Sequence, residues 1–138
     1  MLTESEIREV LAEARTIAVV GLSDNPERDS NGVARYLQRH GYTIVPVNPR
    51  LSGTVLGAQP YPTLYDLPMS VDVVQIFRRP DQVLPIVEAA IAINARVVWF
   101  QLGVVNQAAV QREDEAGLKV VLDRCMAIEH RRLMRRGT

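Results

Sequence analysis

The chain has 138 residues, 47% of them hydrophobic and 23% charged, which is typical of a single globular domain, and we expect that domain to cover residues 1–138. The formal net charge is zero at pH 7, so no overall field favours nucleic acid or an anionic membrane as a partner. The single cysteine, Cys125, excludes an internal disulfide, and no apolar run is long enough to span a membrane or to form a signal-peptide core, so we expect a cytoplasmic protein.

Short apolar runs alternate with helical patterns along the chain. A capping-box pattern from Thr3 to Glu6, followed by apolar residues at helical spacing, predicts a first amphipathic helix. Further helices are predicted up to Gly41, from about Pro80, and between Asn106 and Gly117. The remainder is a helix-compatible stretch that begins at Cys125 and ends in a basic tail at about residues 131–138. Strands are predicted at residues 16–20, 43–47, 71–77, 96–100 and 118–122.

This alternation of strands and helices predicts an α/β fold with a parallel sheet covered on both faces. We expect a single Rossmann-like, doubly wound domain with five strands in the order 3-2-1-4-5. In such sheets ligands bind beyond the carboxyl ends of the strands, here at the switch point between the first and fourth strands. Pro46 does not fit this order, because it removes a ladder donor from a strand that would lie inside the sheet.

The segment from residue 17 to 32, IAVVGLSDNPERDSNG, predicts an anion-binding loop between a strand and a helix. Gly21 permits a tight turn at the end of the strand, and the amides that begin the next helix can face a phosphate; Ser30 is a plausible N-cap of that helix. The dinucleotide fingerprint needs glycines where this chain has Ser23 and Pro26. The loop therefore favours a phosphorylated cofactor other than NAD.

Amide and guanidinium side chains follow the other strands. NAD-binding proteins carry an acidic residue after the second strand, whereas this chain has Asn48 and Arg50, which suit an extra phosphate on the ribose of NADP or coenzyme A. The missing glycines make NADP the weaker choice. Three carboxylates in the loop must point outward or pair with Arg28, since they would otherwise repel a phosphate. The candidate ligand contacts at the strand ends are Gly21, Ser23, Asn25, Arg28, Ser30, Asn48, Arg50, Phe77, Arg78, Arg79, Pro80, Gln101 and Leu102.

The chain resembles the small stand-alone CoA-binding proteins of bacteria and archaea and, more distantly, the N-terminal domain of the succinyl-CoA synthetase α-subunit. The resemblance lies in AVVGLSDNPERDSNGVARYL, VPVNP, VDVVQIFRRP, VVWFQLGV and DRCMAIEHRRL, which occur in this order. It implies that residues 23–26, namely Ser23, Asp24, Asn25 and Pro26, hold the CoA phosphates and that Arg50 is the basic residue after the second strand. It also implies that residues 77–80 line the adenine end and that Phe100, Gln101 and Leu102 lie along the cofactor.

No nucleophile–base pair, carboxylate dyad or metal-ligand set is visible in the sequence. We therefore favour a non-catalytic binding or regulatory module for coenzyme A or an acyl-CoA, with no nucleic acid or membrane partner. The alternatives are an NADP-dependent oxidoreductase on the same fold, or a subunit that lends its CoA site to a separate acyl-CoA ligase. A homodimer is a further possibility.

Two further residues carry open hypotheses. Cys125 is interpreted as a small buried apolar residue, with a mixed disulfide to the thiol of bound CoA as the alternative. His130 has no nucleophile assigned to it, so we expect a surface or interface role. The basic tail is interpreted as solvated rather than as an RNA-binding segment.

Overall fold

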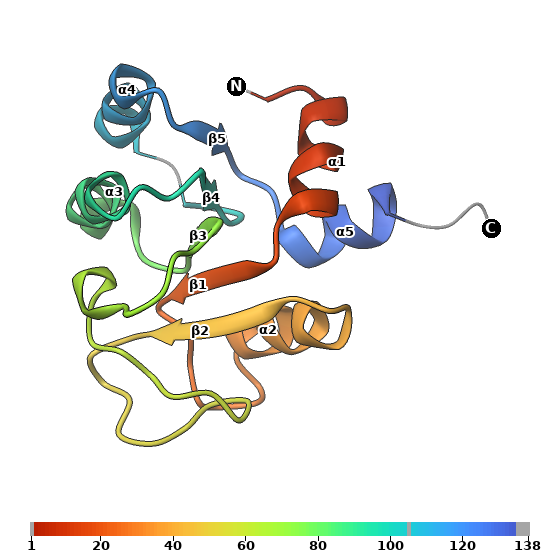
Figure 1. The fold of residues 1–138 in the computed structure, drawn as a ribbon, viewed down its shortest axis with the longest axis vertical. Coiled ribbons are helices and arrows are strands. Elements are labelled where there is room, and N and C mark those ends of the chain that lie inside the picture. The colour runs from red at the N-terminus through yellow and green to blue at the C-terminus, as the bar shows by residue number, and fades with distance from the viewer. Residues whose placement is uncertain (1, 105, 135–138) are drawn as a thin grey trace.

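Five parallel strands form the centre of the computed structural model, which describes residues 2–104 and 106–134. The strands are β1 (Thr16–Val20), β2 (Thr43–Val47), β3 (Val73–Ile76), β4 (Val97–Phe100) and β5 (Lys119–Val121). They lie in the order β2-β1-β3-β4-β5 (Figure 1). The Rossmann-like α/β class and the five-stranded parallel sheet predicted from the sequence are confirmed.

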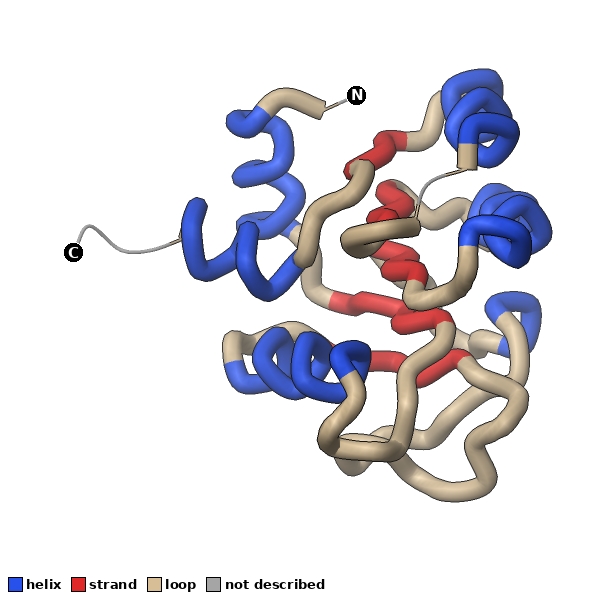
Figure 2. Tube along the Cα trace, turned by 180° about the vertical axis from the view of Figure 1, so that it is seen from behind, coloured by secondary structure: helices blue, strands red, loops and turns tan. Residues whose placement is uncertain are grey.

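Helices cover both faces of this sheet, as Figure 2 shows from the reverse side. On one face lie α1 (Glu4–Glu13), α2 (Asp29–Arg39) and α5 (Met126–Leu133), which share a core with Ile17, Val19 and Trp99 of the strands. On the other face lie the 3-10 helix η1 (Leu64–Asp66), α3 (Val83–Ala92) and α4 (Gln107–Ala116). The short η2 (Pro80–Gln82) leads into α3, so the regular helix begins at Val83. The two cores fix the sheet between the helix layers.

The predicted strand order 3-2-1-4-5 is wrong in the position of β3, which pairs with β1 and β4 instead of β2. The reason is the face on which each crossover runs. The crossover from β1 to β2 passes through α2, whereas the crossover from β2 to β3 passes through η1 on the opposite face. Right-handed crossovers on opposite faces move the chain in opposite directions along the sheet. The switch point therefore lies between β1 and β3, not between the first and fourth strands.

Pro46 fits this corrected order, because β2 is an edge strand. The carbonyl oxygen of Pro46 accepts a hydrogen bond from the backbone N–H of Tyr61, 3.0 Å away, on the side of β2 that faces away from β1. The N–H and C=O groups of one strand residue point to the same side, so the donor that proline lacks would also face this outer edge. The ladder between β1 and β2 stays complete.

Side chains and glycines set several helix ends as predicted. Thr3 and Glu6 form the capping box of α1, Asn106 caps α4 through a bond from the Ala109 amide, and Gly117 ends α4 with a φ of 76°. The predicted N-cap of α2 is wrong: Arg28 holds that position, and the hydroxyl of Ser30 accepts a hydrogen bond from the Ser23 amide instead. Ser30 therefore ties the loop to the helix rather than capping it.

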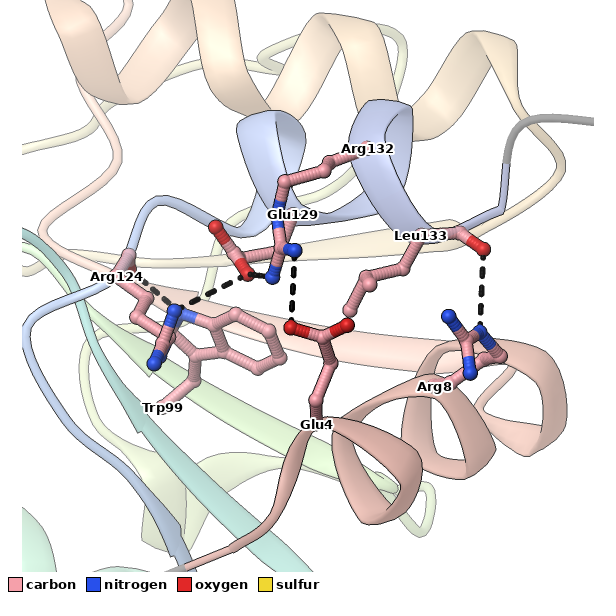
Figure 3. Close-up of polar contacts among 7 residues, drawn as sticks. All are labelled: Glu4, Arg8, Trp99, Arg124, Glu129, Arg132 and Leu133. Atoms are coloured by element: carbon pink, nitrogen blue, oxygen red, sulfur yellow. Dashed lines mark hydrogen bonds and ion pairs between the residues drawn. The ribbon is translucent and has the colours of Figure 1, made fainter.

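Ion pairs and hydrogen bonds hold α5 against α1 and β4 (Figure 3). The buried carboxylate of Glu129 accepts from Arg132 at 2.7 Å, and Arg132 also lies 3.0 Å from Glu4. The indole N–H of Trp99 donates to the backbone oxygen of Arg124 at 2.7 Å. Arg131 and Arg132 therefore belong to α5 rather than to an irregular tail, and both side chains are exposed to solvent, as expected for the basic tail; residues 135–138 lie outside the described part. Within the described residues, no helix has the length and apolar content needed to cross a membrane.

Candidate functional site

Two adjoining hollows lie at the edge of the sheet where the carboxyl ends of the strands meet. The larger, of about 1130 Å³, is lined by the loops that follow all five strands and by the first turns of α2 and α5. The smaller, of about 650 Å³, lies between the loops that follow β1, β2 and β3. Arg28, Arg50, Phe77 and Arg78 line both, so the two hollows form one continuous cleft across the switch point.

Gly21 sits where the loops after β1 and β3 touch. Its φ is 90°, and an added Cβ would lie 2.4 Å from the backbone oxygen of Phe77 and 3.4 Å from Nε of Arg78. Any side chain would push the β3 loop away from β1. Gly21 therefore permits the close approach that brings Phe77 and Arg78 to the cleft.

The loop after β1 uses most of its own amides. Ser23 Oγ accepts from the amide of Asn25, Asn25 Oδ1 accepts from the amide of Glu27, and Ser30 Oγ accepts from the amide of Ser23, at 2.9–3.0 Å. These bonds shape a rigid loop but leave those amides unavailable to a ligand. The amides of Asp29 and Ser30 open α2, where no acceptor exists within the helix, so the anion-binding capacity of this segment lies at the helix N-terminus.

Asn48 is a clamp between three chain segments. Its Nδ2 donates to the backbone oxygen of Leu22 at 3.0 Å, and its Oδ1 accepts from the amide of Arg50 at 3.0 Å and from Nη2 of Arg78 at 3.2 Å. The side chain is buried and its hydrogen-bonding atoms are engaged. Asn48 thus positions Arg78 at the junction of the two hollows.

The cleft is rich in guanidinium groups. Arg28, Arg35, Arg50, Arg78 and Arg79 line it, and Arg78 is half-buried. Burial lowers the pKa of the Arg78 guanidinium, and the charge of Arg50 lowers it further. In the described part of the chain neither Arg50 nor Arg78 forms an ion pair with a carboxylate. Two close cations without a counter-charge are an environment that favours an anionic ligand.

Three carboxylates share the smaller hollow with the arginines, and two of them, Glu27 and Asp29, also line the larger one. Asp24, Glu27 and Asp29 are exposed and line the smaller hollow, and no ion pair to Arg28 is found among the described residues. Of the two arrangements expected for these carboxylates, the pairing with Arg28 is absent from this part of the structure, and all three side chains are instead exposed to solvent. The loop after β1 thus carries three carboxylates beside Arg28, whereas the charged lining residues of the β2 and β3 loops are all arginines.

The far end of the larger hollow has a different character. Val104, Cys125, Leu102 and Ile128 line it, and the last two are exposed. Gln101 is buried there, and its Oε1 accepts hydrogen bonds from Nε2 of Gln75 at 2.9 Å and from the amide of Met126 at 3.1 Å. These bonds join the ends of β3 and β4 to the start of α5. The four apolar side chains beside them form one end of the cleft.

A family profile described as "CoA binding domain" matches residues 15–131. The chain belongs to the CoA-binding domain family. The resemblance to that family predicted from the sequence is thereby confirmed.

Three relatives show how far the likeness extends. The CoA-binding domain is 38% identical over 128 residues to the uncharacterized protein YneT of Bacillus subtilis (strain 168), covering 93% of this chain and 94% of the other. A solved structure of a hypothetical protein from Pyrococcus horikoshii OT3 is 47% identical, with a TM-score of 0.93 over 96% of this chain and 93% of that one. The acetyl-coenzyme A synthetase 1 of Ca. Korarchaeum cryptofilum is 26% identical, with a TM-score of 0.64 over 76% of this chain and 25% of that one.

Most of the predicted site residues line the cleft of this CoA-binding domain. Those that do are Gly21, Ser23, Asp24, Pro26, Arg28, Ser30, Asn48, Arg50, Phe77, Arg78, Arg79, Pro80, Gln101 and Leu102. Asn25 lines neither hollow; its side chain supports the loop from within. Phe100 is a correction: it is fully buried among the residues that face α3 and α4, away from the cleft.

Sequence reasoning missed Arg35, Val104 and Ile128. Arg28, Gly32 and Arg35 lie at i, i+4 and i+7, so one face of α2 carries all three toward the larger hollow. That spacing was readable from the sequence. Ile128 was missed because the end of the fifth strand was not included among the strand ends, although the same edge rule applies to it. Among residues 2–104 and 106–134, no group of three or more His, Cys, Asp or Glu could hold a metal ion.

Proposed function

We propose that this CoA-binding domain binds coenzyme A or an acyl-CoA reversibly in the cleft across the β1–β3 switch point, as a binding or regulatory module. The observation that carries the proposal is the pair formed by the half-buried Arg78 and its neighbour Arg50. Asn48 holds Arg78 in place, so its guanidinium is pre-organised for a phosphate rather than free to turn to water.

The divided charge of the cleft indicates how the ligand lies. The phosphates belong near Arg50 and Arg78, on the β2 and β3 loops, and away from the carboxylates of Asp24, Glu27 and Asp29. Phe77, half-buried at the junction, offers a ring face for the adenine. The pantetheine arm then follows the larger hollow toward Leu102. Membership of the CoA-binding domain family and the likeness to an acetyl-coenzyme A synthetase support this assignment.

Titration calorimetry with CoA, dephospho-CoA, NADP and NAD tests the proposal. We expect CoA to bind, dephospho-CoA to bind at least about tenfold more weakly, and NAD to give no heat, since one charge-assisted phosphate contact contributes roughly 1.5–3 kcal/mol. Binding of NADP without a response to CoA would overturn it in favour of an oxidoreductase. Equal binding of CoA and dephospho-CoA would show that the extra phosphate on the ribose does not contribute to the affinity.

Matched arginine variants locate the site. Arg50→Gln and Arg78→Gln are each expected to weaken CoA binding by about tenfold or more. Arg39→Gln serves as the control, because Arg39 is an exposed arginine in the last turn of α2 and lines neither hollow. If all three variants bind CoA like the wild type, the phosphates lie elsewhere.

A further inference from the structure

We infer that the apolar end of the cleft recognises the acyl group of a CoA thioester, so that this protein prefers an acyl-CoA with an apolar chain to free CoA. This inference rests on the proposed function and names the class of ligand that the same site selects. It is carried by a side-chain amide with a free donor and by two exposed aliphatic side chains, all of which line the larger hollow.

The first observation concerns Gln101. It is 5% exposed and lines the larger hollow. Its Oε1 is directed at Gln75 and at the Met126 amide, which fixes the orientation of the side-chain amide. No acceptor for its Nε2 is found among the described residues, so this N–H₂ group is a donor without a partner at the wall of the hollow. Among the described residues, the fully buried side-chain atoms without a partner are Gln75 Oε1 and the two carboxylate oxygens of Glu113, so Gln101 Nε2 is accessible and can donate to a ligand in the hollow.

The second observation concerns Leu102 and Ile128. They are 59% and 51% exposed, and both line the hollow, although they come from the β4 loop and from α5. Large aliphatic side chains gathered at one end of a cleft are typical of a surface that an apolar ligand covers. Val104 and Cys125 continue the apolar lining behind them.

The charges at the other end of the cleft identify the occupant. Five arginines and three carboxylates line the cleft, and Arg50, Arg78 and Arg79 on the β2 and β3 loops form its cationic part, whereas Leu102, Val104, Cys125 and Ile128 form an apolar part. A ligand that complements both ends has a polyanionic head and an apolar tail, with an acceptor between them opposite Gln101. An acyl thioester of CoA has this order of groups: phosphates, then a carbonyl oxygen, then the acyl chain. Free CoA ends in a thiol and leaves Leu102 and Ile128 in water.

The test compares free CoA, acetyl-CoA, hexanoyl-CoA and the thioether S-hexyl-CoA by calorimetry. From its chain alone, hexanoyl-CoA is expected to bind on the order of thirtyfold more tightly than free CoA, about twofold for each of its five half-covered chain carbons. S-hexyl-CoA keeps the chain but lacks the carbonyl, so it is expected to bind about threefold to tenfold more weakly than hexanoyl-CoA, the effect of one hydrogen bond.

Two surface substitutions test whether Leu102 and Ile128 cause the preference for an acyl-CoA over free CoA. In the double variant Leu102→Ser and Ile128→Ser, we expect the affinity for hexanoyl-CoA to fall at least about tenfold more than the affinity for free CoA, because only the thioester places an apolar chain on these two side chains. Leu84→Ser is the matched control, because Leu84 is a partly exposed leucine on α3 that does not line the cleft. It should leave all four affinities unchanged.

The outcomes separate this inference from the proposed function. If CoA binds and hexanoyl-CoA binds no better, the inference is wrong and the proposed function stands. The same holds if the double variant weakens every ligand equally. If neither CoA nor any thioester binds, both are wrong.

Discussion

The hydroxyl group of Tyr36 on α2 lies 3.0 Å from Nδ1 of His130 on α5. Around this pair, the ring of His40 stacks on Tyr36 at 4.1 Å and lies 5.0 Å from the ring of His130, and the Arg131 guanidinium lies 4.9 Å above the Tyr36 ring. The cluster joins α5, whose first turn lines the larger hollow, to α2. His130 therefore has a structural role between two helices of the same chain.

This cluster predicts a loss of stability in mild acid. Burial, and then the neighbouring His40, lower the pKa of His130 below its ordinary value of 6.5. The unfolded chain therefore takes up a proton on this histidine at a higher pH than the folded chain does, and stability falls as the pH drops below about 6.5. The effect should amount to only a few degrees in melting temperature, because His130 is only half-buried.

Thermal unfolding of the wild type and of His130→Asn between pH 5 and 7.5 measures this loss. The asparagine can keep a hydrogen bond to Tyr36 but cannot be protonated, so its melting temperature should fall less in acid than that of the wild type. Parallel curves for the two proteins would show that His130 does not contribute to the acid sensitivity.

A second titrating group, Glu113 on α4, acts at the opposite end of the pH range. It is fully buried, and both its carboxylate oxygens lack a hydrogen-bond partner within the described residues. Burial, and then the charge of Asp114, raise its pKa from 4.5 to about 8. The folded state therefore keeps a proton that the unfolded state releases, and stability is lost as the pH rises from about 4.5 toward 8.

Glu113→Gln should remove that loss. We expect the variant to unfold like the wild type at about pH 4 and to be more stable at pH 8, by on the order of 2 kcal/mol. Urea unfolding at the two pH values gives the difference. The control is Glu115→Gln, an exposed glutamate on the same helix, for which no gain at pH 8 is expected. A Glu113→Gln variant that gains nothing would mean that the carboxylate finds water or a partner when it ionises.

Alanine substitutions at two glycines with a positive φ distinguish the cost of a left-handed backbone from the cost of a steric clash. Gly21 and Gly41 have φ values of 90° and 97°, but an added Cβ at Gly41 would meet no atom within 4 Å. Gly41→Ala should therefore cost only the left-handed conformation, about 1 kcal/mol. Gly21→Ala adds the clash with the Phe77 oxygen and should cost at least about 2 kcal/mol and also weaken CoA binding.

Denaturant unfolding of both alanine variants, followed by calorimetry with CoA, checks this pair. If Gly21→Ala is no less stable than Gly41→Ala and binds CoA normally, the loops after β1 and β3 do not need to touch. The difference between the variants measures the contact, because the backbone strain is common to both.

The strands were predictable because each is a short apolar run with a polar boundary. The predicted bounds of β1 and β2 agree with the structure at both ends, and β3, β4 and β5 are shorter than predicted by one or two residues at their ends. The order of the strands was not predictable in the same way, because it depends on which face the long link from β2 to β3 crosses. The one local signal was Pro46, which argued for an edge strand.

Most residues of the cleft were predicted from a single rule, and the wrong prediction for Phe100 has a local cause. Loops at the carboxyl ends of parallel strands converge, which predicted most of the cleft. Phe100 was misplaced because successive strand residues point to opposite faces: Phe100 faces α3 and α4, while Gln101 faces α5 and the hollow. The role of Asn48 as a clamp could not be predicted, since it depends on contacts to Leu22 and Arg78 from distant segments.

The one cysteine of the chain provides a reporter for the far end of the cleft. Cys125 is 9% exposed, precedes α5 and lines the larger hollow beside Ile128. Its alkylation by iodoacetamide should be much slower than in the unfolded chain, because the reagent reaches it only through the hollow. Saturating acetyl-CoA, which has no free thiol, should slow the reaction severalfold further if the pantetheine arm occupies that space.

Mass spectrometry of the alkylated protein gives the rate directly, since no other thiol is present. ADP is the control, because it carries a diphosphate and an adenine but no pantetheine arm, and it should leave the rate of alkylation unchanged. Equal protection by ADP and acetyl-CoA would mean that binding tightens the whole fold rather than covering Cys125. No protection by acetyl-CoA, at concentrations where calorimetry shows saturation, would place the arm outside the larger hollow.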